Sequence, residues 1–255
     1  NGVGLNTDGT NLSVEGTATD VAGNERRATV GGTNGINIDS VKPTLTISVN
    51  GSTPSASLEH GNTYFAGQFS LGAVPTLSCT AADALSGPDG CAITSTGGGT
   101  ANANGTGTFT FTATATDKAG NTATVTGSYR VIYAWAGFLQ PINDTAHQVG
   151  TSTSIFKAGS SVPAKFQLKR ADGTVVQANT APEWLTPAKG SATSSPVDEN
   201  LYIDPATSGN LYRWDSTAQQ YIYNWGTAKN QAGNYWRIGV KLDDGQIYFV
   251  NIGLR

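Results

Sequence analysis

The 255-residue sequence is poor in charged residues, contains only two cysteines and has no methionine. Charged residues make up 13%, about half the usual ~25%. With a net charge of -3 and no cluster of Lys or Arg, nucleic acid is not expected as a partner. No apolar run approaches the ~18–20 residues that span a bilayer, so we expect no membrane insertion. Without an initiator methionine, we expect a processed product or a fragment of a longer protein.

The residues that are present favour strands. Thr44–Val49 and Ser161–Lys169 alternate between polar and apolar residues with a period of two, which is typical of half-buried strands. Turn dipeptides such as Asn50-Gly51 follow them, and no helical periodicity extends beyond two turns. The sequence therefore predicts an all-β fold.

An internal repeat indicates the type of domain. Residues 17–24 read TATDVAGN and residues 114–121 read TATDKAGN, 97 residues later, with seven of eight positions identical. Each copy reads as strand, tight turn, strand, with Gly23 or Gly120 supplying a positive φ. The repeat length matches an Ig-like β-sandwich of ~100 residues. We predict tandem Ig-like β-sandwiches.

Three parts follow along the chain. Residues 1–40 correspond only to the last strands of an Ig-like domain, so they cannot cover their own apolar face; either the chain is truncated or something else covers it. Residues 41–133 form a complete Ig-like sandwich. Residues 134–255 contain all five tryptophans and are predicted to form a C-terminal β-sandwich.

Residues 1–133 resemble the bacterial Ig-like repeats of secreted and surface proteins. The resemblance is carried by residues 38–44 (IDSVKPT), by residues 79–87 (CTAADALSG) with Cys91, and by residues 114–121. Such repeats are generally spacers that hold another module away from the cell. The resemblance therefore implies a bacterial surface or secreted protein.

Residues 134–255 resemble a C-terminal module whose signature is Pro-x-Lys-Phe, the PxKF-type domain. The signature here is residues 163–166 (PAKF), supported by residues 220–225 (QYIYNW) and 242–245 (LDDG). Members usually end multi-domain secreted proteins of bacteria, and the family has no well-defined biochemistry to carry over. The resemblance implies a distal module.

The two cysteines, Cys79 and Cys91, are predicted to form a structural disulfide. A metal site would need more Cys or His ligands, and His60 and His147 lie far off in the sequence. A redox pair would normally be closer, as Cys-x-x-Cys. A disulfide implies an oxidising compartment, so we expect an extracellular or cell-surface protein.

Asp39, Asp83 and Asp117 are candidate ligands for Ca²⁺. In an Ig-like sandwich, the entry of the first strand, the B–C loop and the F–G loop lie at one pole, so these carboxylates converge where the first two domains join. Ca²⁺ takes six to eight oxygen ligands. The alternative is that each aspartate caps its own turn. A bound Ca²⁺ would stiffen the interdomain joint.

Tyr221, Tyr223 and Trp225 lie on one face of a predicted strand. If exposed, they form a platform on which sugar rings stack, as in carbohydrate-binding modules. If buried, they are core residues, each removing ~150–250 Å² from water. Both interpretations are open at this point.

No catalytic motif occurs. The sequence has no Gly-x-Ser-x-Gly, no His-Glu-x-x-His and no phosphate-binding Gly loop, and the adjacent Asp243 and Asp244 lie in a turn. We expect a non-catalytic extracellular protein in which Ig-like spacers present a distal module for adhesion or structural assembly. The first alternative is a carbohydrate-binding accessory region of a larger secreted enzyme. The second is a subunit of a self-assembling filament or surface layer. The expected partners are cell-wall or extracellular polysaccharide, or other copies of the chain.

Overall fold

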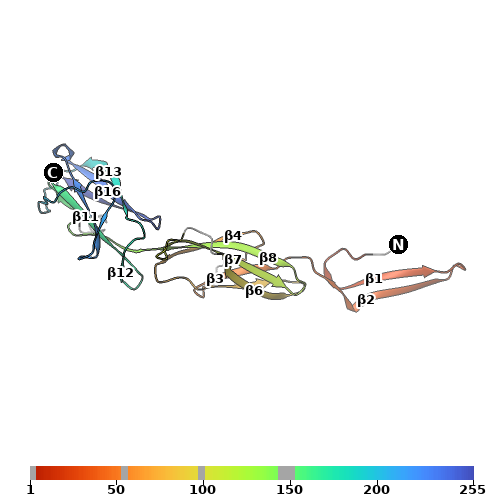
Figure 1. Ribbon diagram of the computed structural model, residues 1–255. Coiled ribbons are helices and arrows are strands. Elements are labelled where there is room, and N and C mark those ends of the chain that lie inside the picture. Colours follow the sequence, from red (N-terminus) through yellow and green to blue (C-terminus); the bar gives the residue numbers. More distant parts are fainter. Residues whose placement is uncertain (1–3, 53–56, 97–100, 143–152) are drawn as a thin grey trace. The chain divides into compact units, whose positions relative to one another are not determined.

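The computed structural model describes residues 4–52, 57–96, 101–142 and 153–255 (Figure 1). The described residues are arranged in strands, with one short 3₁₀ turn at Lys229–Gln231. The chain is an all-β protein. Within the described ranges, no helix has the length and apolar character needed to cross a membrane.

The chain divides into two compact units. The first comprises residues 1–67, 75–98 and 110–129, and the second comprises residues 68–74, 99–109 and 130–255. The first unit holds the N-terminal ribbon and the body of one sandwich, and the second holds the C-terminal sandwich together with two short segments from the preceding part of the chain.

The N-terminal ribbon consists of β1 (Gly9–Thr19) and β2 (Glu25–Ile38), an antiparallel pair drawn in red in Figure 1. Val14 pairs with Val30, and Gly16 pairs with Ala28. In the described part of the chain, no third strand joins this sheet. Val30 is 64% exposed, so the apolar side of the ribbon is not covered.

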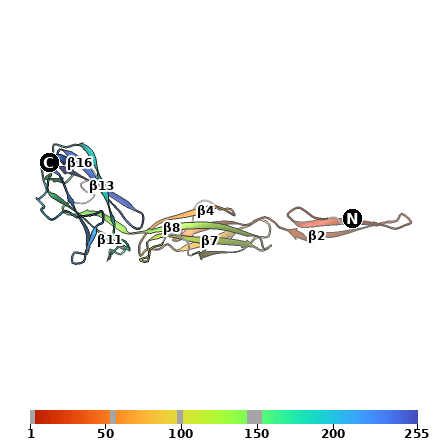
Figure 2. The same ribbon diagram turned by 45° about the horizontal axis from the view of Figure 1, so that its top comes forward.

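Two sheets form the following sandwich. Small and aliphatic side chains and one aromatic ring fill the space between them: Leu45, Ile47, Phe111, Ala113, Ala115 and Val125. One sheet pairs β3 (Thr44–Val49) with β5 (Leu77–Ala82). The other has the order β4 (Thr63–Ser70), β8 (Thr122–Ile132), β7 (Gly107–Asp117) and β6 (Pro88–Ser95). Figure 2 labels β4, β8 and β7 of this larger sheet.

The two repeat copies make the same turn. Asp20 N–H donates to Asn24 O at 2.9 Å, and Asp117 N–H donates to Asn121 O at 3.1 Å. In each copy the Asn N–H also donates to the Asp Oδ1 at 2.8 Å. The aspartate thus satisfies the turn's own backbone, as its residue type predicts. The predicted strand, turn and strand are present in both copies.

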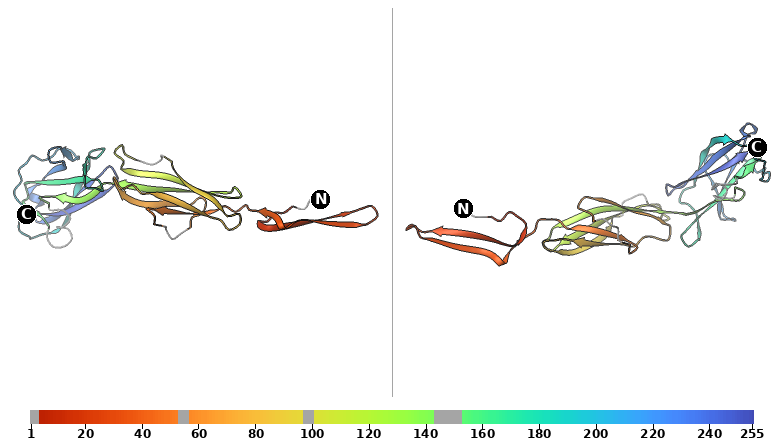
Figure 3. Two further views of the ribbon diagram at one scale, coloured as in Figure 1. Left: turned by 90° about the horizontal axis from the view of Figure 1, so that it is seen from below. Right: turned by 180° about the vertical axis from the view of Figure 1, so that it is seen from behind.

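The C-terminal sandwich also has two sheets (Figure 3). The first has the order β10 (Ile155–Phe156), β17 (Ile247–Leu254), β16 (Asn234–Lys241) and β13 (Glu183–Ala192). The second has the order β12 (Val175–Val176), β11 (Ser161–Lys169), β15 (Gln220–Gly226) and β14 (Arg213–Asp215), and β9 (Ala134–Leu139) also pairs with β11.

The central strand β11 has the bounds that the sequence predicts. Its inward residues Val162, Ala164, Phe166 and Leu168 are each 0% exposed. On the facing sheet, Ile238, Val240, Val250 and Ile252 are equally buried. Alternation of apolar residues on both sheets therefore builds this core.

Candidate functional site

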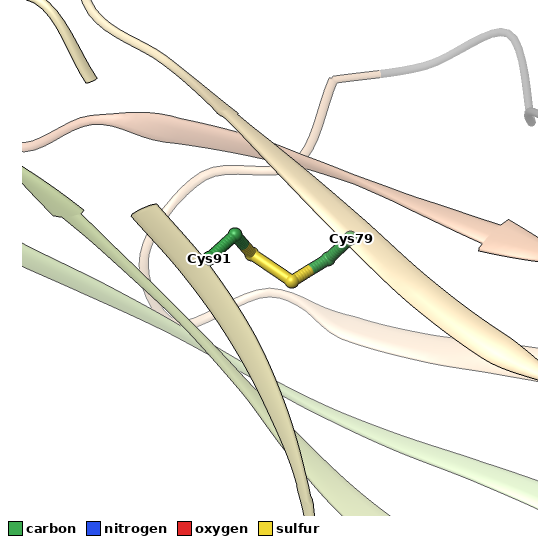
Figure 4. The surroundings of a disulfide bond; sticks show 2 residues. All are labelled: Cys79 and Cys91. Carbon is green, nitrogen blue, oxygen red and sulfur yellow. A yellow bond between two sulfur atoms is a disulfide. The ribbon is translucent and has the colours of Figure 1, made fainter. Parts of the chain in front are cut away.

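The structure has the disulfide predicted between Cys79 and Cys91 (Figure 4). Cys79 lies on β5 of the two-stranded sheet, and Cys91 lies on β6 of the four-stranded sheet, with their Cα atoms 5.7 Å apart. The bond therefore joins the two sheets of the sandwich across their edges.

The three candidate calcium ligands come together. Asp39 precedes β3, Asp83 follows β5, and Asp117 ends β7, so each lies at a strand end. Each offers a carboxylate oxygen, and these oxygens all lie within 4.8 Å of one another. Asp117 is 1% exposed, and the other two are half-buried. Asp83 and Asp117 follow Asp39 by 44 and 78 positions in the sequence, yet the three form one cluster, which we call the carboxylate cluster.

Every member of the carboxylate cluster also accepts hydrogen bonds from backbone N–H groups. Asp83 Oδ1 accepts from Leu85 and Gly87, both at 3.0 Å, which shapes its own loop. Asp39 Oδ1 accepts from Val41 at 3.0 Å, and its Oδ2 reaches across to accept from Ser86 at 3.0 Å. The aspartates therefore cap their own turns, which was the alternative that the sequence left open, and their carboxylates also lie close together.

The charge of the carboxylate cluster is not balanced by an ion pair among the described residues. Lys118 lines a cavity of about 330 Å³ beside Asp39 but forms no such pair. Hydrogen bonding with Ser86 is the main cause that lowers the pKa of Asp39, which favours its charged form. Three carboxylates at this spacing offer the oxygen ligands that a divalent cation takes.

Of the two interpretations of the aromatic rings on β15, the sugar-stacking platform is wrong and the core interpretation is right. Tyr221, Tyr223 and Trp225 lie on one face of β15, as the alternation predicts, but that face points into the sandwich, and they are only 1%, 7% and 8% exposed. Tyr223 stacks on Trp184 at 4.3 Å between ring centroids and donates its hydroxyl proton to Gly209 O at 2.8 Å. Burial raises the pKa of Tyr221 to about 12. The three rings are core residues.

The acidic pair in the last hairpin has a structural role that the sequence does not reveal. Asp244 is 3% exposed and accepts the backbone N–H groups of Tyr133 and Gln246, both at 2.9 Å. Asp243 Oδ1 accepts the hydroxyl proton of Tyr133 at 2.9 Å. Burial raises the pKa of Asp244, and no sequence signal marks Tyr133 as its partner.

A groove on the C-terminal sandwich was also missed. It encloses about 510 Å³ between three loops, 157–161, 201–206 and 226–229. Lys157, Tyr202, Asp204 and Lys229 are among its lining residues. These residues lie up to 72 positions apart and have no common motif, so only the fold brings them together.

No family model matches the chain, and no curated protein matches it either. Solved structures with some similarity include protocadherin gamma B7 extracellular cadherin domains 1–4 (10% identity, 97% of this chain, 65% of that chain, TM-score 0.24). A second is mouse clustered PcdhgC3 EC1-3 (13% identity, 96% of this chain, 77% of that chain, TM-score 0.24). A third is murine CEACAM1b (11% identity, 86% of this chain, 89% of that chain, TM-score 0.22). No conclusion on function follows from similarity of this size.

Proposed function

We propose that this chain is a non-catalytic part of an extracellular or surface-displayed protein, in which the Ig-like sandwich is a spacer and the C-terminal sandwich is the module it presents. The observation that carries the proposal is the disulfide between Cys79 and Cys91, which joins the two sheets of the spacer. A bond of this kind persists in an oxidising compartment outside the cytoplasm.

Two further observations support the proposal. The repeated hairpin of residues 17–24 and 114–121 is what an array of spacer domains of one type contains. In addition, Asp243 and Asp244 are engaged in hydrogen bonds to Tyr133, which supports a structural role for this acidic pair. The bacterial Ig-like and PxKF-type resemblances belong to the same proposal.

Surface display can be tested directly on intact cells that produce the protein. A membrane-impermeant amine-reactive biotin should label the lysines of this chain, whereas a cytoplasmic control protein in the same cells should stay unlabelled. Labelling only after lysis would overturn the proposal. Labelled protein in the culture medium would support the secreted form of it.

The carboxylate cluster is the cation site of the proposed spacer. We propose that Asp39, Asp83 and Asp117 bind Ca²⁺, because their oxygens lie within 4.8 Å of one another and no ion pair in the described ranges neutralises them. The ion would tie the segment that leaves β2 to two loops of the spacer and so stiffen this end of it.

The exposed ribbon favours the self-assembly alternative as a second candidate. Val21 is fully exposed and Val30 is 64% exposed, and in the described chain the two-stranded sheet leaves an unpaired edge on each strand. Such edges pair readily with another strand. Sedimentation velocity over a hundredfold range of concentration tests this candidate, and a monomer at every concentration would contradict it.

A further inference from the structure

We propose that the groove between loops 157–161, 201–206 and 226–229 binds an acidic saccharide, a sugar chain that carries carboxylate groups. The inference rests on the proposed function, because it names what the presented module would recognise. The groove volume of about 510 Å³ lies within the ~300–1,000 Å³ of small-ligand sites. It is separate from the buried aromatic rings of β15.

The walls of the groove are held in place by hydrogen bonds between the loops. Thr227 N–H donates to Ser160 O at 3.0 Å, and Ser161 N–H donates to Tyr202 O at 3.1 Å. Gly159 N–H donates to Thr227 Oγ1 at 3.0 Å. Gly159 has φ +83°, and a Cβ there would lie 3.0 Å from Lys229 Cγ, so its lack of a side chain lets Lys229 lie against the loop. A preformed site needs little ordering on binding.

The charged groups of the groove suit an anion with hydroxyl groups. Lys157 and Lys229 are exposed, both line the groove, and neither forms an ion pair with a described residue. Their ammonium groups can therefore pair with a ligand carboxylate. Asp204, also exposed, has no ion-pair partner in the described ranges and can accept hydrogen bonds from sugar hydroxyls.

Apolar side chains complete the site. Leu201 and Ile203 are 58% and 86% exposed, and Tyr202, which lies between them in the sequence, is half-buried. All three line the groove. These surfaces can pack on the C–H faces of a sugar ring. A peptide that adds a strand would need free backbone groups, but the N–H groups of Gly159, Ser161 and Thr227 are already used within the walls. The observations therefore favour a saccharide.

Affinity gel electrophoresis of the full chain tests the inference, with polygalacturonate, dextran or poly-L-glutamate cast in the gel. We expect retardation by polygalacturonate and not by dextran. The double variant Lys157→Gln/Lys229→Gln should weaken the apparent affinity about tenfold, the combined effect of two exposed ion pairs. The control Lys189→Gln, at an exposed position of β13, removes one charge of the same sign outside the groove and should leave the affinity unchanged.

Each other outcome overturns the inference in a distinct way. No retardation by polygalacturonate overturns it outright, and equal retardation of the double variant and Lys189→Gln would place any binding outside the groove. Retardation by poly-L-glutamate alone would make the groove a site for acidic peptides. Since surface labelling is a separate experiment, a chain that is displayed but does not bind would overturn only this inference and leave the proposed function standing.

Discussion

Asp39, Asp83 and Asp117 show how one side chain can serve two purposes. Each satisfies backbone N–H groups of its own turn, and together they concentrate negative charge at one end of the spacer. The sequence predicts this convergence because the Ig-like topology brings those strand ends to one pole. It could not predict that Asp39 Oδ2 reaches Ser86, because that contact depends on the path of the chain after β2.

Calcium should stabilise the spacer. We expect added Ca²⁺ to raise its melting temperature, since a ligand that binds only the folded state stabilises it. Asp83→Asn should abolish the response. Asp89→Asn, an exposed change of the same charge on β6, should retain it. Differential scanning calorimetry with EDTA or Ca²⁺ measures the shift, and an equal response of the two variants, or none in the parent chain, would contradict the site.

The ring of Phe111 leaves no room for a side chain at Gly127. A Cβ at this position on β8 would lie 2.1 Å from Phe111 Cζ, in the core of the spacer. Gly127→Ala should therefore lower the free energy of unfolding by about 1–3 kcal/mol, the usual cost of overpacking. Gly90→Ala is the control, because nothing lies within 4 Å of the added Cβ, and its effect should stay within about 0.5 kcal/mol. Urea unfolding followed by circular dichroism compares them, and equal stabilities would show that Phe111 moves aside freely.

Trp225 belongs to the core, so its removal should destabilise the C-terminal sandwich. Its ring packs against Trp236 at 5.8 Å between centroids and is 8% exposed. Trp225→Ala should cost about 3–5 kcal/mol. Phe249→Ala, which removes a 40% exposed ring, should cost about 1 kcal/mol or less. Fluorescence of the remaining tryptophans reports the unfolding, and a Trp225→Ala chain as stable as Phe249→Ala would refute burial.

Strand alternation explains why the sequence identified Tyr221, Tyr223 and Trp225 as neighbours but not which way they face. Alternation fixes the side of β15 on which the three rings lie, whereas the side chains that cover this side come from distant residues such as Trp184 and Tyr212. Aromatic rings suit both a core and a sugar platform. The same limit hid the groove, which is built from loops without periodicity.

Among the larger elements, β3, β11 and the two repeat hairpins could be predicted, because their alternation or turn residues act locally. β10 and β12 have only two residues each, too short for a period to be read. The pairing of β10 with β17 is parallel and joins residues 98 positions apart, so no local sequence pattern predicts it.

The disulfide between β5 and β6 should stabilise the spacer by constraining its unfolded state. Closing a loop with a sequence separation of 12 contributes about 3 kcal/mol in the chain-entropy model. The variant Cys79→Ala/Cys91→Ala should therefore unfold at a lower urea concentration by circular dichroism. Because all five tryptophans lie in residues 134–255, the fluorescence transition should be unaffected and serves as the internal control. An unchanged circular dichroism midpoint would show that the bond contributes nothing.

Taken as one molecule, the chain combines a two-stranded ribbon, a disulfide-linked sandwich and an aromatic-rich sandwich. The buried core of the spacer consists of small and aliphatic residues and the single ring of Phe111, whereas the C-terminal sandwich has the larger aromatic core and the loop-lined groove. This difference between the two sandwiches is consistent with the proposal, carried by the disulfide, of a displayed, non-catalytic protein.

The redox state of Cys79 and Cys91 in protein isolated from its producing cells tests this proposal most directly. Free thiols are blocked with N-ethylmaleimide during lysis, and the intact chain is then weighed by mass spectrometry before and after reduction and relabelling. We expect no maleimide on the native chain and two after reduction, because a protein outside the cytoplasm keeps its disulfide. Two maleimides on the native chain would place the protein in a reducing compartment and contradict the proposal.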